Sequence, residues 1–248
     1  MRYLLPILAA ALVLIVACTP PTLETPTVTA APIAGGDTLR LTWTAVTSAT
    51  GYNVYLDATK HQVTSGTSYD VTAPTKLIEV TAYSGSEESD KWTLNTGIVK
   101  TTSVSVDNMG GTGANKAFYF NTSGTAVAIP YAATSSDIDF VLDTTGISTE
   151  LRGPTSYDPD INAKDNASAS AGSTDFDSYN NAPGGGVYST VNTISSGAVY
   201  ALWIDQSPVG WGPEDHFAKM KVENITGNTA TLTLGYQKVG GLRWLRNP

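Results

Sequence analysis

Residues 38–56 read TLRLTWTAVTSATGYNVYL, and the fold prediction rests on this stretch. Apolar and polar side chains alternate within 38–43, and the same alternation returns within 51–56. A period of two residues places one set of side chains on one face of an extended chain, so each segment is typical of a half-buried β-strand. The stretch between them is rich in Ser and Thr, as turns are. We therefore expect two strands with Trp43 in their core.

Similar strand signals recur along the rest of the chain, and no segment shows a sustained helical period. They lie at 67–71, 77–83, 116–120, 125–129, 137–142, 198–204, 217–225 and 229–237. Gly227-Asn228, between the last two, is typical of a tight hairpin. The fold class is therefore predicted to be all-β. We expect a small sandwich over residues 26–90, followed by a larger antiparallel β domain over residues 91–248.

The first 18 residues have the features of an export signal. Arg2 precedes an apolar run over 4–16, which is too short to span a membrane and fits the apolar core of a signal peptide. Ala17 and then Cys18, the only cysteine of the chain, follow this run. The order is similar to the lipobox of bacterial lipoproteins, in which the cysteine becomes the first mature residue and carries the lipid. The alternative is a plain secretory signal with an incidental cysteine.

The lipoprotein interpretation predicts where the protein works. Residues 1–17 would be removed, and Cys18 would attach the mature chain to a membrane through its lipid. The Pro- and Thr-rich residues 18–25 would form an extended tether. Thr19 leaves no acidic residue after the cysteine, which favours the outer membrane or the cell surface.

The charge of the chain bears on its partners. It has 22 Asp and Glu against 14 Lys and Arg, and a formal net charge of −8. Binding to nucleic acid requires clustered lysine and arginine, because contacts to phosphate dominate the affinity. The sequence has no basic stripe, so we expect no nucleic-acid partner. The expected partners are the membrane, through the lipid, and an extracellular ligand that is a protein, a glycan or haem.

Three segments of the first domain carry a family pattern. They are PTVTAAPIAGGDTLRLTWTAVTSATGYNVYLD at 26–57, TSYDVT at 67–72 and IEVTAYSGSEES at 78–89. Together they resemble a fibronectin type III domain, which implies a spacer or a protein-binding module. The chain departs from the family at Lys76 or Leu77, where members usually have a tyrosine.

Four segments of the second domain carry another pattern. They are AFYFNTSGTAVAI at 117–129, SSDIDFVLD at 135–143, YALWIDQ at 200–206 and DHFAKMKVENITGNTATLTLGYQ at 215–237. Their order resembles that of the HmuY-like haem-binding surface lipoproteins. The resemblance implies haem capture by side chains such as a histidine pair, but this domain has only His216. Met109 and Met220 are the other soft ligands, and the sequence assigns no haem ligand, so haem is a less favoured cofactor.

The ligand site is predicted in the long segment between 146 and 197 and in the loop before the strand at 217–225. Aromatic rings in polar loops can stack on sugars or porphyrins, and they can equally pin a loop to a sandwich. Trp211 lies between two glycines, where it forms a ligand platform or plugs the end of the sandwich. The candidate ligand contacts are Tyr157, Tyr179, Tyr188, Trp211 and His216.

An acidic stretch in the same segment resembles a calcium loop, since oxygen ligands at alternate positions suit Ca²⁺. The EF-hand pattern is incomplete, because Ala163 stands in place of its glycine and Ala169 in place of its glutamate. These departures favour the alternative, a solvated acidic loop. The candidate calcium ligands are Asp158, Asp160, Asn162 and Asp165.

Catalytic motifs are missing from the sequence. It contains no GxSxG, no HExxH and no phosphate-binding glycine loop before a helix. His61 and His216 fall in different domains, and Asp137 and Asp139 are predicted to share one face of a strand. We therefore predict a binding protein rather than an enzyme. Its C-terminal domain would bind the extracellular ligand; the alternatives are a haem-capturing lipoprotein, a glycan-binding protein or a structural surface protein.

Overall fold

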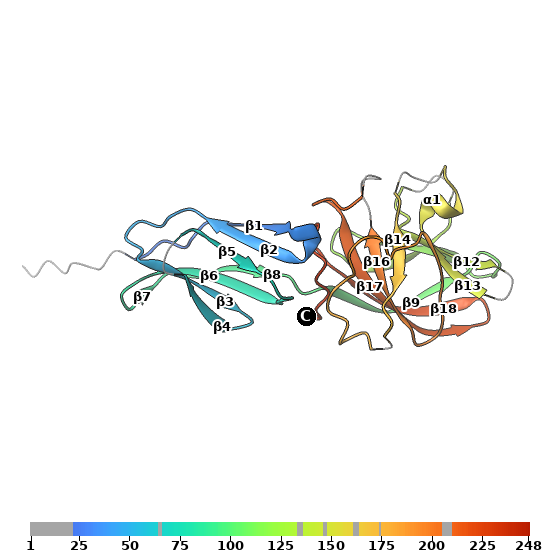
Figure 1. The fold of residues 1–248 in the computed structure, drawn as a ribbon. Helices are drawn as coiled ribbons and strands as arrows, with labels where there is room; N and C mark the ends of the chain where they lie inside the picture. The colour runs from blue at the N-terminus through green and yellow to red at the C-terminus, as the bar shows by residue number, and fades with distance from the viewer. Residues whose placement is uncertain are drawn as a thin grey trace, which may run out of the picture.

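The computed structural model describes residues 22–63, 66–132, 136–145, 148–160, 164–173, 175–204 and 210–248. The predicted signal peptide, Cys18 and Asn162 lie outside these residues. The described chain is nearly all β-structure, as predicted, with one 3-10 turn, η1 (Ala34–Gly36), and one turn of helix, α1 (Pro154–Tyr157). Two lobes follow one another along the long axis of the molecule (Figure 1). Within the described residues, no helix has the length and apolarity needed to span a membrane.

The first lobe is a sandwich of two antiparallel sheets. One sheet contains β1 (Val28–Ile33), β2 (Thr38–Trp43) and β5 (Ser68–Val71). The other contains β3 (Gly51–Leu56), β4 (Thr59–Val63), β6 (Leu77–Ser84), β7 (Glu87–Glu88) and β8 (Trp92–Asn95). The strands predicted at 38–43 and 51–56 are confirmed. Leu41, Trp43 and Val54 are buried in the core between the sheets, as their alternation indicates.

The first lobe extends further along the chain than the sequence predicted. β8 pairs with β6, with Leu94 opposite Ile78, and both Trp92 and Leu94 pack against the core of this lobe. The predicted boundary between residues 90 and 91 therefore falls one strand too early. The pattern misses β8 because a four-residue strand is too short to show a clear alternation.

The second lobe packs two five-stranded antiparallel sheets face to face. One has the order β14 (Ala167–Ser170), β16 (Val199–Ile204), β17 (His216–Thr226), β18 (Thr229–Tyr236), β9 (Val99–Asp107). The other has the order β11 (Ala126–Pro130), β10 (Asn115–Phe120), β12 (Phe140–Thr145), β13 (Ser148–Arg152), β15 (Val191–Thr193). Phe118, Leu202 and Met220 are fully buried between the sheets. The predicted hairpin is confirmed, with Gly227 at a φ of 58° in its turn.

Strand β17 separates this inner core from an outer apolar layer. Ala218 faces the inner core, whereas Phe217 faces the opposite way and packs with Val199, because successive side chains of a strand point to opposite faces. Phe176 and Leu245 belong to the same outer layer. The sheet is therefore covered on its outer face by the loop around 176 and by the end of the chain.

The strand predicted at 137–142 begins later, at Phe140. Asp137 is exposed whereas Asp139 is buried, so the prediction that the two carboxylates share a face is wrong. Asp139 accepts hydrogen bonds from the backbone N–H of Phe120, at 2.8 Å, and from Nζ of Lys164, at 2.9 Å. Burial raises the pKa of this carboxyl, and the ammonium of Lys164 opposes the shift. The side chain is buried because it has these partners, which a polarity pattern does not reveal.

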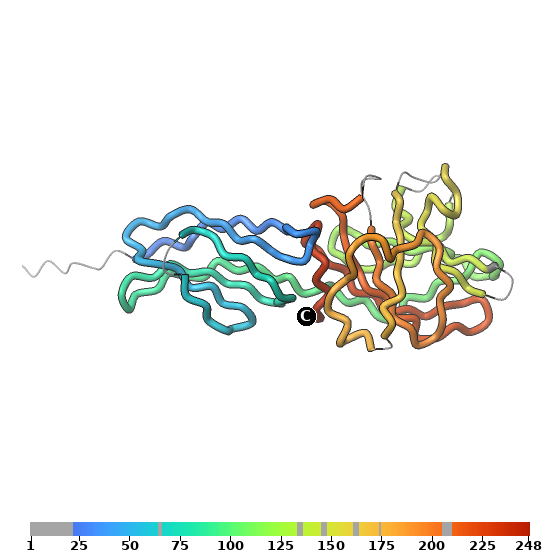
Figure 2. The backbone as a smooth tube through the Cα atoms, viewed as in Figure 1, coloured from blue at the N-terminus to red at the C-terminus, as the bar shows by residue number. Residues whose placement is uncertain are grey.

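Residues 239–248, the C-terminal strap, tie the two lobes together (Figure 2). Trp244 is fully buried in the core of the first lobe, and its indole N–H donates to the backbone oxygen of Asp37, at 3.1 Å. Leu245 donates its N–H to the backbone oxygen of Asn180 in the second lobe, at 2.8 Å. Both lobes hold the same short segment, so the strap restrains how they move relative to each other.

Replacing Trp244 with alanine is expected to destabilise the first lobe, although the residue lies near the end of the chain. Removing a buried aromatic side chain costs about 3–5 kcal/mol. Amide hydrogen exchange in β2 and β6, which build that core, should therefore accelerate. Val187→Ala, at a side chain that is 61% exposed, is the control. Unchanged exchange in β2 and β6 would contradict this role of Trp244.

Candidate functional site

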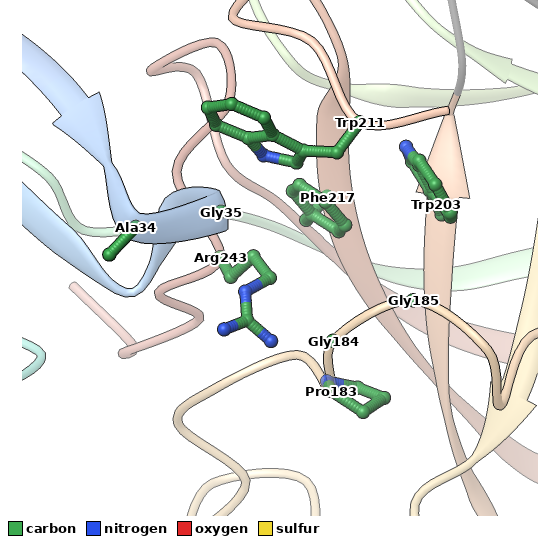
Figure 3. Close-up of a pocket in the computed structure, with 9 residues that line it drawn as sticks. All are labelled: Ala34, Gly35, Pro183, Gly184, Gly185, Trp203, Trp211, Phe217 and Arg243. Atoms are coloured by element: carbon green, nitrogen blue, oxygen red, sulfur yellow. The ribbon is translucent and has the colours of Figure 1, made fainter. Parts of the chain in front are cut away.

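A cleft of about 260 Å³ opens where the two lobes meet, and we call it the junction cleft (Figure 3). The η1 turn of the first lobe forms one wall, and three aromatic rings of the second lobe form another. Ligand sites occur preferentially at such domain junctions. The lining residues are Ala34, Gly35, Pro183, Gly184, Gly185, Trp203, Trp211, Phe217 and Arg243.

Trp211 lies at the edge of the junction cleft and remains 37% exposed. Its indole N–H donates to the backbone oxygen of Gly241, at 3.1 Å, so the C-terminal strap fixes the ring. Gly36 of the first lobe lies close by. A Cβ at that position would come within 3.2 Å of the indole nitrogen and would overlap the backbone of Gly241. The glycine is therefore needed for the lobes to approach, and Trp211 lies at the junction of the lobes.

Two stacked rings add to the aromatic surface. Trp203 of β16 and Phe217 of β17 are paired across the sheet, with ring centroids 6.0 Å apart and an interplanar angle of 21°. The indole N–H of Trp203 donates to Oδ2 of Asp215, at 3.0 Å. The same oxygen accepts the N–H of Gly212, at 2.8 Å. Asp215 thus connects the strand to the loop that carries Trp211.

Arg243 supplies the polar chemistry of the junction cleft. The residue is 7% exposed, and its Nη1 donates to the backbone oxygen of Ala182, at 3.2 Å. Nη2 forms an ion pair with Asp37 of the first lobe. Nε is buried and has no hydrogen-bond partner within the described residues. The cleft is therefore lined by a guanidinium whose charge is balanced, and the buried N–H of its Nε is left without a partner among the described residues.

The loop that carries Pro183 and Gly184 is fastened to the sheet by a buried lysine. Lys219 is fully buried, and its Nζ donates to the backbone oxygens of Phe176, at 2.7 Å, and Tyr179, at 2.8 Å. Burial lowers the pKa of Lys219 to about 8. This amine holds the first part of the loop against β17, beneath the cleft wall.

Two of the predicted tyrosines support the cleft without lining it. The ring of Tyr188 meets Trp203 edge to face, with centroids 5.5 Å apart, and its hydroxyl donates to the backbone oxygen of Pro183, at 3.2 Å. Tyr179 packs in the same outer apolar layer. Burial raises the pKa of both hydroxyls, so both stay neutral near pH 7. These tyrosines pin the loop, which is the second of the two roles predicted for them.

Tyr157 lies apart from the junction cleft, at the end of α1. Its ring meets Tyr131 edge to face, with centroids 5.2 Å apart, and both belong to a small apolar cluster. The hydroxyl of Tyr131 donates to Asp158, at 3.0 Å. The structure therefore does not bring Tyr157 together with Trp211.

The predicted calcium ligands are only partly described. Asp158 accepts the N–H of Asp160, at 3.0 Å, and Asp165 accepts a long hydrogen bond from Thr155, at 3.4 Å. Asn162 lies outside the described residues. Over the residues that the structure does describe, no group of three or more His, Cys, Asp or Glu side chains is arranged to hold a metal ion. The calcium hypothesis stays a prediction.

The potential haem ligands lie away from the junction cleft. Met220 is fully buried in the inner core of the second lobe, and Met109 packs against the cluster that contains Tyr157. His216 precedes Phe217 and so faces the other side of the sheet, where its ring stacks on Tyr236. These three side chains lie in three different surroundings.

Several lining residues of the cleft carry no local signal in the sequence. The pattern of the sequence indicates only that Trp203 and Phe217 lie in strands, and no motif marks Arg243 or the turn at Ala34 and Gly35. Arg243 and its partner Asp37 come from opposite ends of the chain. No local pattern reports such a contact, and the only signal for the site was Trp211 between its two glycines.

Comparison with known proteins gives a distant structural similarity. No protein-family model matches the chain, and no curated protein matches it. Among solved structures, the chain is similar to the crystal structure of a DUF4466 family protein from Parabacteroides merdae. The two are 10% identical with a TM-score of 0.42, over 88% of this chain and 100% of that chain. A similarity of this size carries no argument about function, which therefore rests on the chain's own residues.

The substitution Lys219→Met should change how stability depends on pH. Because burial lowers the pKa of Lys219 to about 8, the unfolded chain binds more protons than the folded chain between that value and the ordinary 10.5. The wild type should therefore gain stability with rising pH in this window. Relative to the variant, its free energy of unfolding should rise by about 1–3 kcal/mol between about pH 8 and about pH 10.

Denaturant titrations at a series of pH values measure this difference. Lys60→Met, at an exposed position of the first lobe, is the matched control and should show no such trend. A wild-type-to-variant difference that is constant from pH 8 to pH 10 would contradict a buried, shifted amine at position 219.

Proposed function

We propose that this chain is an exported, lipid-anchored surface protein that binds an extracellular glycan in the junction cleft. The observation that carries the proposal is the fixed, partly exposed indole of Trp211 beside a buried N–H donor of Arg243. The first lobe positions the second away from the membrane and supplies one wall of the cleft. Lipid anchorage, spacing and glycan binding are three parts of one proposal, and each has separate support.

The aromatic surface favours a sugar ligand. The cleft presents the apolar faces of three rings, those of Trp203, Trp211 and Phe217. The apolar C–H face of a sugar ring stacks on such rings, and the hydroxyl groups of the sugar form hydrogen bonds. The cleft volume of about 260 Å³ is below the roughly 300–1,000 Å³ typical of sites for drug-sized ligands. It suits one sugar ring, the end or a single unit of a longer glycan.

The electrostatics favour a neutral sugar over an anionic one. Asp37 already pairs with the guanidinium of Arg243, so the cleft offers no uncompensated cation from this pair. The buried Nε of Arg243 would donate to a hydroxyl or ring oxygen, and satisfying a buried donor stabilises the complex. The backbone at Gly184 and Gly185 allows close approach, because these residues have no side chain.

The strap contributes to affinity by holding the cleft open before the ligand arrives. Trp244 is buried in the first lobe while Leu245 is bonded to the second, so the walls do not have to be assembled on binding. A site that is already organised avoids part of the entropic cost of binding. A glycan of modest contact area can therefore be held.

The position of the lobes follows from the predicted anchor. The run before Cys18 resembles a lipobox, and residues 18–25 would tether the first lobe to the membrane. The two-sheet sandwich of the first lobe supports its resemblance to a fibronectin type III spacer. The junction cleft would then face the surroundings of the cell, beyond the spacer.

The substitution Trp211→Ala should weaken glycan binding while leaving the fold intact. Loss of the stacking face is expected to weaken binding of a neutral glycan, identified on a glycan array, by at least about 10-fold, a typical effect of removing an aromatic anchor. Titration calorimetry with that glycan measures the change. Val187→Ala removes another exposed apolar side chain and should leave affinity unchanged. A wild type that binds no array glycan, or a Trp211→Ala variant that binds as tightly, would refute the proposed ligand class.

The substitution Cys18→Ser tests the lipid anchor. The wild-type chain expressed in a Gram-negative host should incorporate labelled palmitate and partition into detergent, because two or more acyl chains give stable anchoring. The variant should lose the label and the partitioning. Processing of the wild type to a water-soluble form without label would instead support a plain secretory signal.

A further inference from the structure

A second depression, the sandwich mouth, lies at one end of the second lobe and has a volume of about 530 Å³. Phe120 of β10 and Tyr236 of β18 line it, so both sheets of the sandwich contribute. His216 lines it as well, whereas the next residue, Phe217, lines the junction cleft. Consecutive residues of a strand point to opposite faces, so the two pockets lie on opposite sides of the same sheet.

A column of three rings forms one wall of the sandwich mouth. The ring of Tyr236 lies between Phe120, with centroids 4.7 Å apart, and His216, with centroids 5.1 Å apart; both interplanar angles are 26°. Nδ1 of His216 donates to the backbone oxygen of Gln237, at 3.0 Å, which fixes that ring. All three rings are half-buried, so the column is held in place and still reaches the surface.

The charge at the sandwich mouth is opposite to that of the whole chain. Lys164 and Lys238 line it, and no carboxylate does so within the described residues. The ammonium of Lys164 lies 2.9 Å from the buried carboxylate of Asp139, which balances one of the two positive charges. Lys238 is exposed and leaves the mouth positive, although the chain has a formal net charge of −8.

Polar groups complete the surface. Asn121 and Thr122 add an amide and a hydroxyl beside the ring column. Aromatic rings bind the apolar face of a sugar, an amide and a hydroxyl bind its hydroxyl groups, and an ammonium binds an attached anion. The volume lies within the range of small-molecule sites, and it is about twice that of the junction cleft.

We propose that the sandwich mouth binds an acidic saccharide, a sugar whose ring carries a carboxylate or a sulfate. The ring stacks on the column of Phe120, Tyr236 and His216, and the anionic group lies by Lys238. This site is separate from the junction cleft and does not depend on the function proposed for that cleft. The protein would then have one pocket for a neutral sugar and one for an acidic sugar, on two faces of one sheet.

Titration calorimetry with matched disaccharides tests the proposal. The probes are cellobiouronic acid, cellobiose bearing a 6-sulfate and unmodified cellobiose, and the protein is the mature chain with Cys18→Ser. At least one acidic probe should bind at least about 10-fold more tightly than cellobiose, with an affinity that falls as salt is raised. Lys238→Glu should lower the affinity for that probe by at least about 10-fold, because it reverses the exposed charge.

Two variants provide the controls. Lys60→Glu makes the same charge change at an exposed position of the first lobe and should leave the affinity within about twofold, because charges further apart than a Debye length are screened. Trp211→Ala should have no effect on the acidic probe. Lys238 is exposed, so its substitution should leave the thermal unfolding midpoint unchanged.

Each contrary result has a definite meaning. The proposal would be overturned if all three disaccharides bound with equal affinity, or if neither acidic probe bound at millimolar concentration. It would also be overturned if Lys60→Glu lowered the affinity for the acidic probe as much as Lys238→Glu does. If the Trp211→Ala variant no longer bound the acidic probe, the probe would bind in the junction cleft. The inference about the sandwich mouth would then be wrong, while the glycan function proposed for the cleft would remain.

Discussion

The arrangement of the lobes depends on the burial of Trp244, a residue of the C-terminal strap, in the core of the first lobe, while the adjacent Leu245 packs in the outer apolar layer of the second lobe. The indole completes the first sandwich and bonds to the backbone of Asp37, while the adjacent Arg243 forms an ion pair with the carboxylate of the same residue. A buried aromatic side chain is costly to separate from its partners, and so is the buried guanidinium of Arg243, although its partner Asp37 is exposed. The junction cleft exists because these contacts hold η1 against the loop of Trp211.

In the second lobe, the side chains of β17 alternate between two apolar layers, one on each face of the sheet. Side chains of β17 that face inward build the core between the sheets, and those that face outward pack under the loop around Phe176 and the strap. At the end of β17 the same alternation sends Phe217 to the junction cleft and His216 to the sandwich mouth. Two pockets of different character, one aromatic with a balanced charge and one aromatic and cationic, therefore arise from consecutive residues.

Most of the strands could be predicted from the sequence, because half-buried strands alternate. Residues 38–43 and 51–56 show this directly. The prediction failed where burial depends on a partner rather than on polarity: Asp139 is buried because Lys164 and the N–H of Phe120 satisfy it. Of the candidate site, the sequence indicated Trp211. It did not indicate Arg243, whose ion-pair partner Asp37 lies near the other end of the described chain.

The sequence by itself determined the all-β class and the inward faces of the long strands, because these follow from the chemistry of neighbouring residues. It also supplies the lipobox-like run before Cys18, on which the proposed anchor rests. Only the tertiary structure decided that the last strand of the first lobe is β8, that the strap joins the lobes, and which rings meet in each pocket. The physical reason is distance along the chain: local patterns report local periodicity, whereas the junction cleft is made by contacts between residues from opposite ends of the chain.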